Sequence, residues 1–305
     1  MGKFILKRFL EAIPVLLAVV TLTFFMVRLA PGSPFDDERP LRPEVREALE
    51  AHYGLDKPLL QQYVSFLGGL LQGDLGISYR KPTFTVAQIV RENLPASLEL
   101  AIYAILSALG IGLTFGLVAA VRPNTWSDFG PMGFAMIGIC LPSFVLGPIL
   151  ILVFAIHFDW FNASGWDHPS DRILPALTLG LFFAAYIARL TRASMLEVRE
   201  QDYMRTALAK GIPFHRAYLK HGLRNALAPV IAYLGPAMAG LVSGSFVVES
   251  LYQVPGLGRH FVRSALDSDY TLILGVTVVY AVLLIAFNLI ADIVLGLLDP
   301  RVRYE

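Results

Sequence analysis

Charged residues are scarce in this chain of 305 residues. They make up 16% of the sequence, whereas hydrophobic residues make up 55% and the mean hydropathy is +0.60. An ordinary soluble domain contains about 25% charged residues, which cover much of its surface. The composition therefore argues against a soluble enzyme, a nucleic-acid-binding protein and a disordered linker, and it indicates an integral membrane protein.

Several features that would point to chemistry are also missing from the sequence. The single cysteine, Cys140, permits no internal disulfide and no cysteine-rich metal site. Neither the P-loop motif G-x-x-x-x-G-K-[ST] nor the zinc-protease motif H-E-x-x-H occurs. The net charge of +1 gives no electrostatic reason to expect a nucleic acid partner. We therefore predict that the chain is not an enzyme and has no catalytic residue, no metal ligand and no cofactor of its own.

Six stretches are apolar enough to cross a membrane as helices of about 20 residues. They cover residues 9–29, 96–121, 129–158, 173–190, 227–248 and 270–298. The first continues to Arg28 and Pro31 without a small-residue cleavage site, so we expect an uncleaved anchor rather than a signal peptide. An N-in, C-in topology places fourteen of the 25 lysines and arginines in inner segments. The sequence thus predicts an all-α integral membrane protein with six transmembrane helices.

This topology divides the chain into four parts. Residues 1–30 form the inner N-terminus and the first span, 31–95 an outer segment, 96–298 the other five spans, and 299–305 an inner tail. The outer segment is predicted to contain two short amphipathic helices between Pro43 and Leu71, broken by Gly54 and Pro58. Residues 194–226, within the third part, form a basic inner loop.

Few ionisable residues lie within the expected spans. Glu11 and Asp292 lie near inner ends and Glu99 lies near an outer end, where each can reach the interface or pair with a neighbour. We find none near the midplane, where an ion-coupled secondary transporter would be expected to carry them. A polar cluster typical of a membrane-embedded enzyme is not evident either. Both classes remain as alternatives that the sequence does not favour.

Small residues mark the second and fifth expected spans. Two G-x-x-x-G spacings occur, Gly112/Gly116 in the second span and Gly240/Gly244 in the fifth. Such spacings allow helix backbones to approach closely, so helix packing is one interpretation. The other is a transport path, because the stretch around Gly240 is small and slightly polar. We predict that Gly240, Ser243, Gly244 and Ser245 line a translocation path.

The inner loop has a regular pattern of helix formers and helix breakers. A run of strong helix formers follows Glu200 and ends at Gly211, and a second short helix is expected to begin near Pro213. We predict a compact helical knuckle whose small residues, Thr206, Ala207 and Ala209, allow close docking with a partner. The alternative is a polybasic loop on anionic lipid.

The same loop resembles the EAA loop of ABC-importer permeases. The peptide branch of that family has the form D-Y-x-R-T-A-x-A-K-G followed by H-x-L-R-N-A-x-x-P. The matching residues are Asp202, Tyr203, Arg205, Thr206, Ala207, Ala209, Lys210, Gly211, His221, Leu223, Arg224, Asn225, Ala226 and Pro229. Arg205, Thr206, His221 and Arg224 depart from the general EAA pattern.

Further motifs resemble the B-type subunits of bacterial oligopeptide permeases. They lie at residues 4–14, 28–35, 53–58, 73–76, 254–258 and 299–304. Each motif is weak by itself. Together and in this order they are specific for the family, and they cover essentially the whole chain.

The resemblance implies a type I ABC importer permease fold in the bacterial inner membrane. It implies a second, different permease subunit, two cytoplasmic ATPase subunits that use ATP and Mg, and a periplasmic binding protein that delivers oligopeptides. Membrane lipid surrounds such a chain and nucleic acid takes no part. The ATPase-coupling residues implied are Asp202, Tyr203, Arg205, Thr206, Ala207, Ala209, Lys210, Gly211, His221, Arg224 and Asn225. Dipeptides, glutathione or nickel are alternative cargoes of the same architecture.

Overall fold

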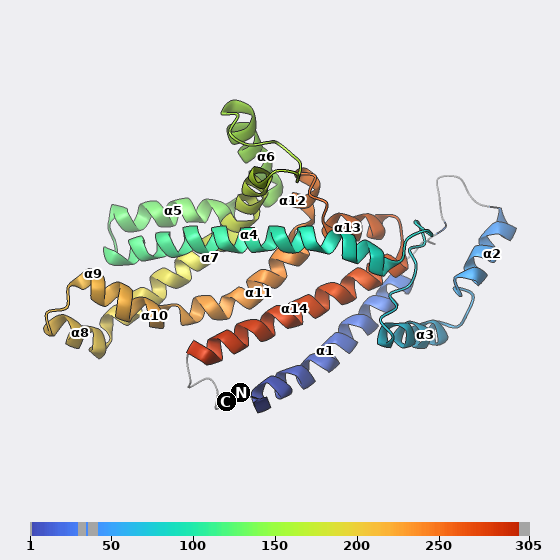
Figure 1. Ribbon diagram of the computed structural model, residues 1–305, viewed down its shortest axis with the longest axis horizontal. Helices are drawn as coiled ribbons and strands as arrows, with labels where there is room; N and C mark the ends of the chain where they lie inside the picture. The colour runs from blue at the N-terminus through green and yellow to red at the C-terminus, as the bar shows by residue number, and fades with distance from the viewer. Residues whose placement is uncertain (1, 30–34, 36–41, 299–305) are drawn as a thin grey trace.

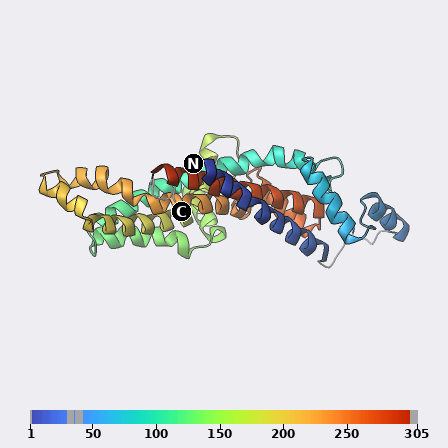
Figure 2. The same ribbon diagram turned by 90° about the horizontal axis from the view of Figure 1, so that it is seen from below.

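The computed structural model describes residues 2–29, 35 and 42–298, and this part of the chain is helical. No β-strand occurs in the described ranges, where Ile77 and Thr85 form an isolated antiparallel bridge. Long helices run side by side along the molecule, and groups of short helices lie at its two ends (Figure 1). The view from below shows the same elongated arrangement (Figure 2).

Four unbroken helices in the described residues are long and apolar enough to cross a membrane. They belong to α1 (Gly2–Leu29), α4 (Val86–Val121), α7 (Ile173–Glu200, preceded by the short helix η2, Pro169–Arg172) and α14 (Tyr270–Leu298). Two bent pairs pass the same test: residues 126–157 and residues 214–244. The described chain therefore has four crossings, or six if each bent pair counts as one, which fits the predicted all-α membrane fold.

The third expected span is not one straight helix. It consists of α5 (Trp126–Cys140), α6 (Ser143–Leu150) and η1 (Ile151–His157), with a bend of 113° between the two halves. The break falls before Pro142, whose ring restricts the preceding residue to extended backbone, and Leu141 accordingly has φ −99° and ψ 120°. As a result α6 points away from the direction of α5 (Figure 1).

Helices α4 and α7 are each longer than the sequence pattern predicts. Helix α4 begins at Val86 rather than near residue 96, because Thr85 and Gln88 form a reciprocal capping box at its start. Pro95 therefore lies inside the helix. Helix α7 continues to Glu200 rather than ending near residue 190, and its last ten residues extend toward the short helices of the inner loop.

The short helices form two separate groups. Helices α8 (Asp202–Ala209), α9 (Phe214–Arg216), η3 (Ala217–Gly222) and α10 (Leu223–Ala226) lie at one end, before α11 (Ala228–Gly244). Helices α2 (Pro43–His52) and α3 (Leu59–Leu71) lie toward the opposite end (Figure 1). Helices α12 (Phe246–Leu251) and α13 (Leu257–Leu266) connect α11 to α14. The two helices predicted between Pro43 and Leu71 are confirmed, with Gly54 at φ +66° between them.

The core is built by the close approach of α4 and α7. A Cβ atom on Gly112 would lie 2.7 Å from the carbonyl oxygen of Ala184, and one on Gly116 would lie 2.6 Å from that of Ala188. Only glycine fits at these two positions, so the first G-x-x-x-G spacing serves helix packing. Helix α11 packs along α14, and α1 packs on the other side of α14.

Ion pairs join the ends of the long helices. Asp128 in α5 is buried and accepts two 2.7 Å hydrogen bonds from the Arg192 guanidinium in α7. Glu99 in α4 pairs with Arg172 at 3.0 Å. Asp292 pairs with Arg8 at 3.2 Å. Glu99 and Asp292 thus pair with neighbours, which is one of the two outcomes expected for them, and each pair ties one helix to another.

Gly112→Ala should destabilise the protein, because its methyl group would force α4 and α7 apart. Overpacking of this kind costs about 1–3 kcal/mol. Gly110→Ala is the matched control, because nothing lies within 4 Å of a Cβ atom there and alanine favours the helix by up to about 1 kcal/mol. Thermal unfolding of both purified variants measures the difference. Equal midpoints for the two variants would contradict the packing role of Gly112.

Candidate functional site: a helical knuckle and a membrane cavity

The helical knuckle, defined as residues 202–226, rests on the ends of the two core helices. Its buried core contains Met204 and Ala207 from α8 and Ala217, Tyr218 and Ala226 from the following helices. These residues pack against Met195 and Val198 at the end of α7 and against Ala120 at the end of α4. The knuckle is therefore packed directly against the ends of α4 and α7.

The two halves of the loop motif meet on the knuckle surface. The amide nitrogen Nδ2 of Asn225 donates a 2.9 Å hydrogen bond to the hydroxyl of Tyr203, 22 residues earlier. Asp202 and Arg205 lie 3.9 Å apart, but both are exposed, so their pairing contributes little stability. The hydrogen bond between Tyr203 and Asn225 thus joins α8 to α10, so that their exposed residues form one surface.

Ten of the eleven predicted coupling residues are exposed on the knuckle. They are Asp202, Tyr203, Arg205, Thr206, Ala209, Lys210, Gly211, His221, Arg224 and Asn225. Ala207 differs, because it is 9% exposed and packs inward beside Met204. The small-residue face predicted for docking is therefore reduced to Thr206 and Ala209, and Ala207 instead fixes α8 to the core.

Gly211 ends α8 as the sequence predicts. It has φ +78°, and its N–H donates to the carbonyl oxygen of Leu208 at 3.0 Å, while Ile212 N–H donates to that of Ala207 at 3.2 Å. A left-handed residue of this kind closes a helix and is most easily glycine. The second half then begins at Pro213 and contains a π-helical turn, η3, a feature often found at functional sites.

A second feature is a cavity of about 380 Å³ at the break between α5 and α6. Its lining comes from three elements: Gly138, Ile139, Leu141, Pro142 and Ser143 at the break, Thr178, Leu179, Phe182 and Phe183 on α7, and Gly240 and Gly244 on α11. The bend at Pro142 thus creates space in the part of the molecule predicted to lie within the membrane.

The four predicted path residues lie in three different surroundings. Gly240 and Gly244 line the cavity, and a Cβ atom on Gly244 would meet nothing within 4 Å. Ser243 instead faces a narrow apolar groove between α1, α11 and α14. Ser245 is buried and donates a 2.6 Å hydrogen bond to Glu249. The second G-x-x-x-G spacing therefore borders open space, in contrast to Gly112 on α4.

Glu249, which the sequence reasoning overlooked, is the centre of a buried polar cluster. Its carboxylate is fully buried and accepts hydrogen bonds from the hydroxyls of Ser97 at 2.8 Å and Ser245 at 2.6 Å. It also accepts the backbone N–H of Arg259 at 3.3 Å, at the start of α13. The Ser97 hydroxyl accepts the N–H of Leu257. The cluster joins α4, α11, α12 and α13.

The glycines of the motif at 254–258 make room for this carboxylate. A Cβ atom on Gly258 would lie 2.9 Å from Glu249 Oε2, and a Cβ atom on Gly256 would lie even closer to the carboxylate. The signal was therefore present in the sequence as an acidic residue shortly before a glycine-rich turn.

On α13, burial and the nearby charges of Lys81, Arg259 and Arg263 lower the pKa of His260 to about 4.

Comparison with known proteins assigns the fold. The family model described as the inner membrane component of binding-protein-dependent transport systems matches residues 112–304, and its N-terminal counterpart matches residues 1–101. The chain also resembles a chain of the MetNI methionine ABC transporter, with a TM-score of 0.55 and 18% identity over 69% of this chain and 96% of that chain. The fold is that of ABC-importer permeases.

Sequence relatives extend over the full length of the chain. The chain is 46% identical over 306 residues to the oligopeptide transport system permease protein OppB of Salmonella typhimurium, and the match covers all of both chains. It is 42% identical to the dipeptide transport system permease protein DppB of Bacillus subtilis, over 99% of this chain and 98% of that protein. The chain belongs to the family of binding-protein-dependent transport system inner membrane components.

Glu249→Ala should destabilise the protein strongly, because two buried hydroxyls and one partly buried N–H would lose their acceptor. An unsatisfied buried group costs about 1–3 kcal/mol, so the summed loss is several kcal/mol. Glu249→Gln keeps one carbonyl oxygen as an acceptor and should lose less. Glu92→Ala, at an exposed position on α4, is the control. If Glu249→Ala and Glu92→Ala unfold at the same temperature, the cluster has no anchoring role.

Proposed function

We propose that this chain is the permease subunit of an ATP-binding-cassette importer and forms half of a path for oligopeptides. A periplasmic binding protein delivers the peptide, and ATP hydrolysis in two partner subunits drives its uptake. The observation that carries the proposal is the knuckle, an exposed polar surface mounted on the ends of α4 and α7. The named functions of OppB and DppB support a peptide cargo, and the DppB match makes dipeptides the alternative.

The orientation follows from the distribution of basic residues. The knuckle and the inner ends of α4, α7 and α14 face the cytoplasm, where the positive-inside rule places exposed lysines and arginines. Helices α2, α3 and α13 then face the periplasm of a bacterial inner membrane. This topology puts the knuckle beside the cytoplasmic ATPase subunits and the opposite end beside the binding protein.

The mechanism is rigid-body coupling of the knuckle to the membrane helices. When ATP closes the two ATPase subunits on each other, the knuckle moves with them, and its core transmits the motion to α4 and α7. Helix α7 carries Phe182 and Phe183, which line the cavity opposite Gly240. A displacement of α7 therefore changes the width of the cavity, which would switch the path between inward-facing and outward-facing states.

The assembly is tested by purifying the chain from its native cells in mild detergent and identifying the accompanying proteins by mass spectrometry. We expect two ATPases with P-loops, a second six-span permease and a binding protein whose bound ligand is a peptide. A chain that purifies alone, or as a homo-oligomer, in several detergents would contradict the proposal and favour a self-powered carrier.

Gly211→Val should uncouple ATP hydrolysis from uptake while the protein still inserts into the membrane. A left-handed backbone costs a side-chain-bearing residue about 1–2 kcal/mol, and a β-branched residue accommodates it least well. Gly211→Asn is the matched control, because asparagine tolerates this conformation. The ratio of ATP hydrolysed to peptide taken up in proteoliposomes is measured. Unchanged coupling in Gly211→Val would refute the role of the helix end.

Gly244→Leu should block uptake by filling the cavity without unfolding the protein. Gly130→Leu is the control, because Gly130 on α5 also has nothing within 4 Å of a Cβ atom and does not line the cavity. Uptake by Gly244→Leu should fall to background, with ATP binding and the unfolding temperature retained. Normal uptake in this variant would show that the path does not pass Gly244.

A further inference from the structure

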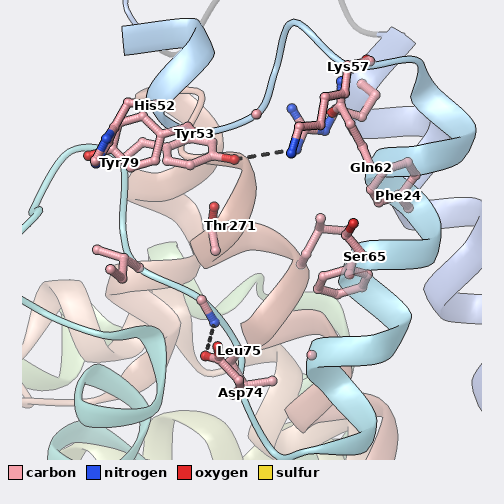
Figure 3. Close-up of a pocket in the computed structure, with 17 residues that line it drawn as sticks. Phe24, His52, Tyr53, Lys57, Gln62, Ser65, Asp74, Leu75, Tyr79 and Thr271 are labelled. Atoms are coloured by element: carbon pink, nitrogen blue, oxygen red, sulfur yellow. Dashed lines mark hydrogen bonds between the residues drawn. The ribbon is translucent and has the colours of Figure 1, made fainter.

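A further pocket lies at the α2–α3 end, away from the knuckle and the membrane cavity. It has a volume of about 410 Å³, within the range typical of ligand pockets. Its walls come from α1, α3, α14 and the two loops at residues 52–57 and 74–79 (Figure 3). Three motifs that are far apart in the sequence meet here: Arg28 belongs to the first, Tyr53 and Lys57 to the second, and Asp74 to the third.

The pocket is held in shape by the start of α14. The buried carboxylate of Asp269 accepts hydrogen bonds from the hydroxyl of Ser78 and from the backbone N–H groups of Tyr79 and Leu272. Arg80 Nε donates a 3.0 Å hydrogen bond to the carbonyl oxygen of Asp267. These contacts fix the 74–79 loop on α14, so the ring of Tyr79 has a defined place in the wall.

One end of the pocket carries positive charge without a described counter-ion. The Arg28 guanidinium lies over the rings of Phe24 and Tyr270, and it donates one long hydrogen bond, 3.4 Å, to the Tyr79 hydroxyl. Within the described ranges, no carboxylate lies within 4.0 Å of Arg28 or of Lys57. This end is therefore suited to an anionic group, and a guanidinium binds carboxylates in a preferred bidentate geometry.

Several aromatic side chains line the pocket, together with aliphatic and polar residues such as Gln62, Ser65 and Thr271, and an acidic residue lies at the far end. Phe24, Phe66, Tyr53 and Tyr79 contribute rings to its walls. Lys57 and Asp74 lie at opposite ends in Figure 3, and Asp74 Oδ1 accepts the N–H of Gly76 at 2.8 Å. Walls that mix aromatic rings with polar groups, between a cationic end and an acidic end, match a short zwitterionic chain that carries a hydrophobic side chain.

Helix α3 forms one wall of the pocket and turns a different, apolar face outward. Its Tyr63 hydroxyl shares a 2.6 Å hydrogen bond with Thr21 of α1. The residues that line the pocket, including Gln62 and Phe66, lie on one face of α3. Leu60 and Val64, on another face, have 69% and 61% of their surface exposed and continue the apolar surface of α1. A phospholipid would contact that apolar face, so the pocket behind α3 favours a water-soluble ligand.

We propose that this pocket binds a short peptide on the periplasmic side, with the peptide's carboxylate paired to Arg28 and Lys57. The inference rests on the proposed function, since it assigns a second binding site for the same class of cargo. We call it the waiting site, because the peptide would be bound there before it enters the path. The aromatic walls hold the peptide's hydrophobic side chains, and Asp74 faces its amino end. Peptide released by the binding protein would be retained at the outer mouth before it enters the path.

The test uses the complete transport complex in lipid nanodiscs without the binding protein. The tripeptide Ala-Phe-Ala and its C-terminal amide serve as probes, and calorimetric titration measures their affinities. Loss of one charge-assisted hydrogen bond should weaken binding about tenfold, both for the amide and for Arg28→Gln. Lys57→Gln, at an exposed position, should weaken binding several-fold. Arg91→Gln, an exposed arginine outside the pocket, should leave it unchanged.

Three results would overturn the assignment: no binding to the wild-type complex, equal affinity for the free acid and the amide, or displacement of the tripeptide by phosphatidylglycerol, which would indicate a lipid site. Uptake of the same tripeptide in proteoliposomes with the binding protein separates this inference from the proposed function. Uptake without pocket binding refutes only the waiting site. Absence of any peptide uptake refutes the proposed function itself.

Discussion

The close packing of α4 against α7 is the interaction on which the rest of the structure depends. Backbone approaches backbone at Gly112 and Gly116, where no side chain fits. In a membrane, helices gain little from hydrophobic burial against each other, so close van der Waals contact between small residues supplies much of their association. This pair of helices therefore forms a rigid axis. The knuckle, the cavity at the α5–α6 break and the Glu249 cluster all contact it.

Different groups of residues contact the two ends of the α4–α7 pair. At one end, Ala120 and Met195 form part of the knuckle core, so the exposed motif residues stand on the last turns of α4 and α7. Toward the other end, Ser97 of α4 donates to Glu249, and Glu99 pairs with Arg172. A buried carboxylate such as that of Glu249 is tolerable only when it is hydrogen-bonded or paired. The cavity at the α5–α6 break lies against α7, between these two groups.

Local signals in the sequence predicted several elements well. Gly54 and Pro58 separated α2 from α3, and Gly211 ended α8, because a left-handed residue or a proline acts on its immediate neighbours whatever the tertiary fold. From the G-x-x-x-G spacing alone, the prediction that Gly240 lines a path could not be distinguished from a role in helix packing. The structure distinguishes the two glycine pairs, since Gly244 faces a cavity and Gly116 faces the backbone of α7.

Other features depended on contacts that no local pattern reveals. The second span was expected to begin at residue 96, but the capping box at Thr85 starts α4 at Val86. The apolar run at 129–158 was long enough for one span, yet Pro142 divides it by a sharp bend. Glu249 lay one residue beyond the predicted fifth span, and its role requires Ser97, which is 152 residues away in the sequence. Ala207 was expected on the docking face but packs inward.

The central claim, that the knuckle carries the force of partner ATPases into α4 and α7, is tested most directly by photo-crosslinking in cells. A photoreactive phenylalanine analogue is placed at Thr206, exposed on the knuckle, or at Leu60, exposed on α3 at the other end. The account predicts a covalent adduct between the Thr206 position and a P-loop ATPase, and none from the Leu60 position. Transport-competent cells in which the Thr206 position gives no ATPase adduct would contradict it.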